Sequence, residues 1–236
     1  MVILVAYIKH KETIKLPVTL KDDLWYLMIA TLYLFFSSFK GYFGLFDGII
    51  LFGLYFVFVT HQYIETKRLQ KDRKKHTEEI SKNKWIKNVT FMVIGAIGVL
   101  LVAEPFVHVI IEISVETGVS AIILAVVISP IASEMPEKIS AFRLASRSLK
   151  GAEIAVANFI GSKVQASTLL FGSIILLKIY LTEEVFDVSG TFILILFAVL
   201  TTLVGVWITY DLKLKLKEGF LVLLLYIIST VVIIVV

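Results

Sequence analysis

The sequence predicts an all-α, polytopic membrane helix bundle. Hydrophobic residues make up 58% of the 236-residue chain, and the mean hydropathy is +0.91. Charged residues make up only 18%, against about 25% in a typical soluble domain. The apolar residues also gather into runs close to the roughly 20 residues that a helix needs to cross a bilayer. We therefore expect an integral, multi-pass protein of the cell (plasma) membrane, in contact with the lipid bilayer.

The side-chain inventory excludes several kinds of chemistry. The chain has no cysteine, so disulfides, thiolate metal sites and cysteine nucleophiles are excluded. Its four histidines are scattered without the sequence spacing of metal ligands. No Ser/His, Cys/His or His-x-x-x-His constellation supports an intramembrane enzyme. We expect neither catalysis nor an organic cofactor.

The charges between the apolar runs predict a topology. The basic segments are 9–21, 67–87, 143–150 and 213–217, and the acidic ones are 112–116 and 183–187. Because cytoplasmic loops are rich in Lys and Arg, the amino terminus is expected in the cytoplasm and the carboxyl terminus outside. The run at residues 1–7 is too short to span and fits the tail of a helix that begins earlier. The expected spans are 24–39, 45–63, 88–111, 119–142, 152–180, 191–210 and 220–236.

The basic run 67–87 has two interpretations. A nucleic-acid site would be basic, but a basic run between two apolar spans is typical of a cytoplasmic loop. We therefore expect a solvated linker and no nucleic-acid partner.

Two carboxylates lie inside an otherwise apolar span. The segment 132–137 reads Ala-Ser-Glu-Met-Pro-Glu, and a carboxylate costs roughly 2.5–3.5 kcal/mol at the centre of a spanning helix. Pro136 lacks an N–H, so the carbonyl of Ala132 loses its helical partner. Glu134 and Glu137 share a helix face and, with the Ser133 hydroxyl and freed carbonyls, offer the all-oxygen ligands that Ca²⁺ or Na⁺ prefers.

The following span supplies a second polar wall. Asn158, Ser162 and Gln165 recur at helical spacing on one face of an apolar helix, and we expect this face to lie against Glu137. Three glycines should allow close helix approach: Gly151, Gly161 and Gly172.

Plainer interpretations of these polar residues stay open. Glu134 is four residues from Lys138 and fits a structural ion pair. The stripe on the second helix fits interhelical hydrogen bonding without any ligand.

The two motifs together resemble the α-repeat of the cation/calcium exchanger superfamily. One helix of that repeat carries Gly-Thr-Ser-x-Pro-Glu and the next carries Gly-Asn-x-x-Gly-Ser, and the counterparts here are 132–137 and 157–162. Segments 103–106 and 129–134 look like a prokaryotic branch of these sodium/calcium or proton/calcium antiporters. The resemblance runs from about residue 21 to the end.

The resemblance implies roles for individual residues. Glu137 matches the ion-binding glutamate, and Ser133 and Ser162 match ligating hydroxyl residues. Asn158 matches the asparagine of the second motif. Glu134 stands where sodium/calcium exchangers usually have serine, and Gln165 is closer to the pattern of proton/calcium exchangers, so the coupling ion stays open.

The family fold has two inverted repeats with the ion site between them, whereas this chain carries one such motif. The resemblance therefore implies half of an inverted-repeat exchanger fold with a broken helix at the ion site. We expect residues 1–63 to be the terminal helices of an incomplete first half and 64–87 a basic cytoplasmic linker. Residues 88–236 would be the second half, with the α-repeat at 119–180.

The implied function is secondary-active cation antiport, with Ca²⁺ exchanged for Na⁺ or H⁺ as the transported ions. Such a half needs a partner, either a separately made first-repeat subunit or a missing amino-terminal half. The alternative is a non-transporting membrane subunit that retains the exchanger fold.

Overall fold

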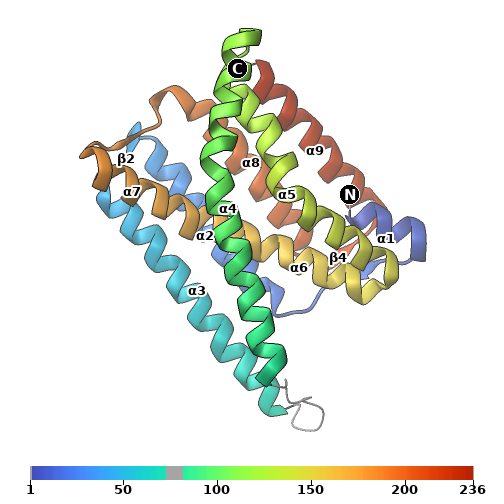
Figure 1. Ribbon diagram of the computed structural model, residues 1–236. Coiled ribbons are helices and arrows are strands. Elements are labelled where there is room, and N and C mark those ends of the chain that lie inside the picture. The colour runs from blue at the N-terminus through green and yellow to red at the C-terminus, as the bar shows by residue number, and fades with distance from the viewer. Residues whose placement is uncertain (1, 73–81, 236) are drawn as a thin grey trace. The chain divides into compact units, whose positions relative to one another are not determined.

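The computed structural model describes residues 2–72 and 82–235 (Figure 1). The chain folds into two compact units. We call residues 1–63 with 136–236 the large unit and residues 64–135 the small unit, and each is described by itself. Some side chains within α5, including those of residues 131–134 and 136, lie outside the description.

The chain is helical over most of its described length. The helices are α1 (Val2–His10), α2 (Leu20–Ser38), α3 (Leu45–Asp72), α4 (Lys82–Thr117), α5 (Ala121–Arg147), α6 (Leu149–Gln165), the π-helical turn η1 (Ala166–Leu170), α7 (Phe171–Thr182), the 3₁₀ turn η2 (Ser189–Thr191), α8 (Phe192–Thr209) and α9 (Leu216–Val235). The strands are β1 (Ile14–Lys15), β2 (Tyr42–Phe43), β3 (Phe186–Asp187) and β4 (Lys213–Leu214). Each predicted span coincides with helix, so the predicted all-α membrane fold class is confirmed.

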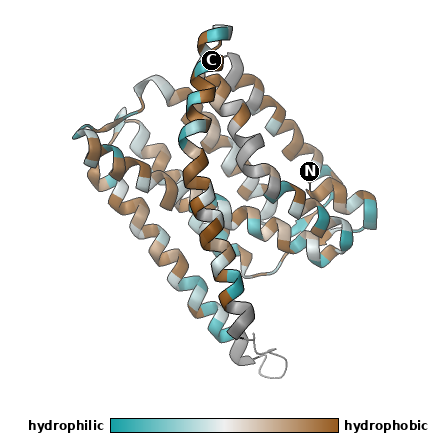
Figure 2. Ribbon diagram, in the orientation of Figure 1, coloured by the Kyte–Doolittle hydropathy of each residue, from teal (hydrophilic) through white to brown (hydrophobic). Residues whose placement is uncertain are grey.

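Several helices are long and apolar enough to cross a bilayer. By length and composition, four stretches within the described residues qualify: Leu45–Arg68, Ile86–Thr117, Leu149–Thr182 and Ser189–Thr209. The third of these joins α6, η1 and α7 into one helix. Figure 2 shows α3 to be apolar over most of its length and hydrophilic toward its carboxyl end. The chain is an integral, multi-pass membrane protein.

The small unit contains α4 and the amino-terminal part of α5. Gly118, with φ of +71°, ends α4 in the left-handed conformation that glycine adopts without strain. The Gly118 amide donates to the Ser114 carbonyl, and the Ser114 hydroxyl donates to the Val119 carbonyl at 2.7 Å. These bonds fix the turn from α4 into α5.

The large unit is built around α2, α6 and α8. Helix α2 packs against both α6 and α8, while α1 packs against α6 and α9. Its buried apolar side chains form three clusters along the bundle, represented at one end by Ile14, Leu20 and Leu214, in the middle by Leu24, Phe58 and Val164, and at the other end by Phe43, Leu51 and Ile175.

Two short antiparallel sheets close the ends of the large unit. Strand β1 pairs with β4, with Lys15 opposite Lys213, and β2 pairs with β3, with Tyr42 opposite Asp187. Since β1 precedes α2 and β2 follows it, the sheets lie at opposite ends of α2. The basic loops around Lys15 and Lys213 thus share one end, in agreement with the predicted loop grouping.

The large unit contains an internal repeat. The order helix, strand, helix, strand, helix occurs as α1–β1–α2–β2–α3 and again as α7–β3–α8–β4–α9. In both copies an acid three residues into the last helix accepts from the backbone just before it. Gly44 N donates to Asp47 Oδ2 at 2.8 Å, and Lys215 N donates to Glu218 Oε2 at 2.9 Å. Both copies also have a residue with positive φ after the first helix, Lys11 in one and Glu183 in the other. A second such residue precedes the second strand, Gly41 in one copy and Leu212 in the other.

The two copies run in opposite directions. Strand β1 corresponds to β3 in the repeat, yet β1 pairs with β4 and β3 pairs with β2. Helix α8 therefore runs antiparallel to α2, its counterpart, against which it packs. This is the inverted-topology relationship found in many transporters.

Glycines allow close helix crossings at equivalent places in the two copies. A Cβ on Gly48 of α3 would lie 2.8 Å from Leu176 of α7, and one on Gly219 of α9 would lie 2.9 Å from Leu4 of α1. Gly172 also meets α3 closely, as predicted, because a Cβ there would lie 3.1 Å from the Gly48 carbonyl oxygen. At Gly161 no described atom lies within 4 Å of where its Cβ would be, so close approach there stays a prediction.

Candidate cation-binding site

A tight turn sets α5 against α6. Ser148 is the single residue between the two helices and caps α6, with its hydroxyl accepting from the Gly151 amide at 2.9 Å. Gly151 is required there, because a Cβ would lie 2.1 Å from the Leu144 carbonyl oxygen. The turn brings Glu137, on α5, level with the middle of α6.

Glu137 is held by two side chains of α6. Its Oε1 accepts hydrogen bonds from Asn158 Nδ2 at 3.0 Å and from Ser162 Oγ at 3.1 Å. Asn158 and Ser162 lie four residues apart and so share a face of α6. Glu137 and Ser162 are half-buried, whereas Asn158 is exposed. The structure therefore brings two members of the polar stripe expected from the sequence to the carboxylate.

No ion pair within the described part of the chain neutralises the charge of Glu137. Among the described residues, no lysine or arginine lies within ion-pair distance of its carboxylate. Both groups that bond Oε1 are neutral donors, which orient a carboxylate without cancelling its charge. The oxygens of Asn158 and Ser162 keep lone pairs for a further partner. The arrangement can supply a charged oxygen ligand and two neutral ones to a hard cation.

A second membrane acid, Asp47, has the opposite environment. Its side chain is 5% exposed, and Lys40 Nζ bonds both carboxylate oxygens at 2.8 Å. Tyr33 donates its hydroxyl to Asp47 Oδ1 at 2.7 Å, and the Gly44 amide caps Oδ2. Every strong interaction of this carboxylate is already made within the protein, so Asp47 is structural.

The remaining predicted site residues fall into two groups. Gln165 is exposed at the end of α6, and in the described part of the chain no hydrogen bond joins it to Glu137. The side chains of Ser133 and Glu134 lie outside the described residues, as does that of Ala132. Their predicted roles as ligands therefore stay predictions.

The predicted helix break needs correction. Helix α5 continues from Ala121 to Arg147 through Pro130 and Pro136. A proline inside a helix removes one backbone hydrogen bond and favours a kink, but neighbouring helices can keep the chain helical around it. The carbonyls of Val126 and Ala132 still lack their usual N–H partner, as expected from covalent structure alone.

A π-helical turn directly after Gln165 was not predicted. It spans Ala166–Leu170, inside the continuous helix Leu149–Thr182, and such turns occur often at functional sites. The fully buried Thr168 donates its hydroxyl to the Val164 carbonyl at 2.6 Å. A π-helical turn inserts one extra residue into the helix, so it changes which face of α7 continues the polar face of α6. No residue type in the sequence marks this turn.

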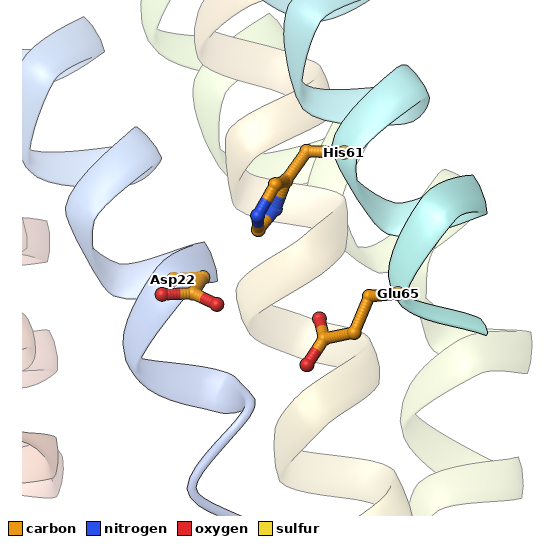
Figure 3. A group of neighbouring side chains, drawn as sticks. All are labelled: Asp22, His61 and Glu65. Carbon is orange, nitrogen blue, oxygen red and sulfur yellow. The ribbon is translucent and has the colours of Figure 1, made fainter. Parts of the chain in front are cut away.

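A group of ionisable side chains on α2 and α3 was also missed. Figure 3 shows Asp22 of α2 pointing toward the His61 ring of α3, with Glu65 one turn later on α3. A carboxylate oxygen of Asp22 lies within 4.8 Å of a ring nitrogen of His61. The histidines lack ligand spacing among themselves, but His61 and Glu65 have the i,i+4 spacing that could have indicated this group.

Comparison with protein families gives a match over most of the chain. The model of the family described as "Sodium/calcium exchanger protein" matches residues 87–235. No curated protein matches the chain.

Solved structures of two exchangers share the fold. The crystal structure of the H⁺/Ca²⁺ exchanger CAX matches with a TM-score of 0.80 and 23% identity, covering 99% of this chain and 64% of that one. The sodium-calcium exchanger NCX_Mj, soaked with Na⁺ and Sr²⁺, matches with a TM-score of 0.58 and 19% identity, covering 96% and 70%. The same exchanger soaked without Na⁺ and Ca²⁺ matches with a TM-score of 0.56 and 20% identity, and the match covers 95% of this chain and 69% of that one. The chain thus spans less than two thirds of the H⁺/Ca²⁺ exchanger.

Proposed function

The chain belongs to the sodium/calcium exchanger protein family, and from this we propose that it is a secondary-active cation antiporter that exchanges Ca²⁺ for Na⁺ or H⁺. The observation that carries the proposal is the Glu137 carboxylate, which two neutral donors orient and no described cationic side chain neutralises. A half-buried carboxylate inside a membrane bundle that no described side chain compensates attracts a cation.

Glu137 supplies the charge in this proposal, and α6 supplies its orientation. Ca²⁺ takes six to eight oxygen ligands, so Glu137, Asn158 and Ser162 are too few by themselves. Ser133, Glu134 and the Ala132 carbonyl, one turn earlier on α5, extend the proposed ligand set. Gln165 would lie at its edge.

Competition for the same oxygens would produce exchange. Two nearby carboxylates raise each other's affinity for protons, and Na⁺ favours the same oxygen ligands as Ca²⁺. Occupancy by one ion then excludes the other, and rocking of one helix group against the other exposes the site to each side in turn. No bond is made or broken in the protein.

The internal repeat supports the need for a further segment. Helices α1–α3 and α7–α9 are copies of the same element order with inverted direction, whereas α4, α5 and α6 have no counterpart among the helices described here. We propose that counterparts of α4–α6 come from a first-repeat partner or an amino-terminal extension. They would complete the ligands around Glu137 and Asn158.

Calcium uptake into vesicles tests the proposal. Vesicles containing the chain and its first-repeat half are loaded with Na⁺ or acidified, and Ca²⁺ uptake is compared between wild type and Glu137→Gln. Gln keeps an oxygen for Asn158 and Ser162 but removes the charge, so we expect at least a tenfold lower rate, about 1.4 kcal/mol of lost cation binding. Na⁺ loading and acidification separate the two coupling ions.

Glu153→Gln is the matched control. Glu153 lies on α6 but on another face from Asn158, as helical periodicity requires, so its uptake rate should stay at the wild-type value. Equal uptake by wild type and Glu137→Gln would overturn the proposal. Folded protein that carries no Ca²⁺ with either ion gradient would favour the alternative, a membrane subunit that keeps the fold without transport.

A further inference from the structure

We propose that Asp22 and His61, joined by Glu65, bind a divalent transition-metal cation such as Zn²⁺ at an accessory site on α2 and α3, separate from Glu137. Zn²⁺ is bound in proteins by imidazole nitrogen and carboxylate oxygen, commonly with three protein ligands and one water. Figure 3 shows these three side chains and the two helices that carry them. The site goes beyond the proposed exchange of Ca²⁺.

The geometry of α3 provides two of the ligands. His61 and Glu65 are four residues apart on α3, and this spacing puts two side chains on one helix face, as in helical zinc motifs. Asp22 adds the third ligand from the first turn of α2, with a carboxylate oxygen within 4.8 Å of a His61 ring nitrogen. Within the described residues, this is the one such group of three histidine or acidic side chains.

The imidazole itself is the independent indication of a ligand. His61 Nδ1 is buried, and among the described residues it has no hydrogen-bond partner. A buried polar atom without a partner is unfavourable, and a metal ion bound at Nδ1 would remove this cost. The Tyr26 ring, 5.8 Å away between centroids, holds the imidazole in place.

The neighbouring residues leave Asp22 available for this role. Gln62, next to His61, donates to Asp23, next to Asp22. This bond already joins α2 to α3, so the parallel pair of Asp22 and His61 is not required as a helix clamp. The imidazole favours Zn²⁺ and similar metals over Ca²⁺, which prefers oxygen ligands alone.

The position indicates an accessory role at the cytoplasmic surface. α3 leads into the basic segment 64–87, which the charge pattern places in the cytoplasm. The site shares no residue with the Glu137 cluster, so Ca²⁺ should not displace the metal from it.

Zn²⁺ binding to the purified full chain in detergent tests the proposal, measured by titration calorimetry in excess Ca²⁺. We expect saturable binding of one Zn²⁺ per chain that His61→Gln and Asp22→Asn each weaken by at least tenfold, since even the loss of an outer-shell partner costs roughly 10–100-fold. Glu137→Gln should bind Zn²⁺ like wild type, whatever its effect on Ca²⁺ exchange.

His108→Gln is the matched control for the histidine. His108 and Glu104 have the same i,i+4 spacing on α4 and lie 3.9 Å apart, but their side chains are 69% and 86% exposed. Zn²⁺ affinity should not change in this variant. Equal affinity of wild type and His61→Gln, or no saturable binding by wild type, would overturn the proposal.

The test stays decisive if a variant fails to fold. If only His61→Gln fails to fold, the Zn²⁺ affinity of Asp22→Asn decides the test. If both are lost, X-ray absorption of Zn²⁺ on wild type and on His108→Gln should show one imidazole ligand in each, and a spectrum without imidazole would contradict the site.

Discussion

Two membrane carboxylates differ in how their charge is compensated. Asp47 is buried and bonded by Lys40, Tyr33 and the Gly44 amide, so it contributes to stability. Glu137 is half-buried and bonded by the neutral groups of Asn158 and Ser162. A carboxylate that is positioned but that no described cation neutralises is suited to bind a transported ion reversibly, because no cationic side chain among the described residues competes for it.

The Asp47 environment predicts an asymmetry between two substitutions. Lys40→Met leaves a buried carboxylate without its cation, and removing one partner of a buried pair costs about 3–5 kcal/mol. The lower end applies, since the Lys40 side chain is 44% exposed. Asp47→Asn removes the charge itself and keeps an oxygen for the Gly44 amide, so it should cost only about 1–2 kcal/mol. Thermal unfolding in detergent measures both.

The double variant Lys40→Met/Asp47→Asn provides the control for this pair. It removes both charges, so its stability should be closer to that of Asp47→Asn than to that of Lys40→Met. If Asp47→Asn were the more damaging single change, the buried carboxylate would not depend on Lys40.

At the scale of the helices, close packing at glycine sets how α3 crosses α7. Gly48→Ala would place a Cβ 2.8 Å from Leu176, whereas nothing described lies within 4 Å of the corresponding atom at Gly53 on the same helix. Overpacking costs typically about 1–3 kcal/mol, and an unhindered Gly→Ala in a helix gains up to about 1 kcal/mol. Gly48→Ala should therefore lower the unfolding temperature and Gly53→Ala should keep or raise it. Equal effects of the two variants would contradict the crossing.

The helices were predictable because hydropathy alone marks them. The α5–α6 contact was also predictable. Asn158 and Ser162 have helical spacing, and Glu137 is an acid in the preceding apolar span that this polar face could contact. The strands were not, because two-residue strands such as Ile14–Lys15 depend on a partner far along the chain. The π-helical turn and the passage of α5 through Pro136 depend on packing that no local pattern encodes.

Some of the candidate chemistry needed the fold. Asp22 and His61 are brought together by the packing of α2 beside α3, so no motif joins them in the sequence. Comparing histidines only with one another missed this pair. The internal repeat followed only from the family resemblance, which implied that residues 1–63 are the terminal helices of a first half. Gly41 and Leu212 share only a positive φ, and the acid-glycine pairs Asp47-Gly48 and Glu218-Gly219 are too short a pattern to mark a repeat by themselves.

For the whole molecule, inversion predicts which loops face the same side of the membrane. Lys15 and Lys213 pair in one sheet, and Tyr42 and Asp187 pair in the other, at the opposite end of α2. All four residues are exposed, and the chain has no cysteine of its own. Single cysteines at these positions can therefore report sidedness with a membrane-impermeant thiol reagent on intact cells.

We expect labelling from outside at Tyr42→Cys and Asp187→Cys, and at Lys15→Cys and Lys213→Cys only after the membrane is permeabilised. The loop charges set this direction, because basic loops stay in the cytoplasm. The double variant Lys15→Cys/Lys213→Cys should also form a disulfide under oxidation, since directly opposed residues of paired strands have Cβ atoms about 4.5–5.5 Å apart. Labelling from outside of one member of a pair but not the other would contradict the inverted repeat. Labelling from outside of Lys15→Cys and Lys213→Cys alone would keep the repeat and reverse the expected orientation of the protein in the membrane.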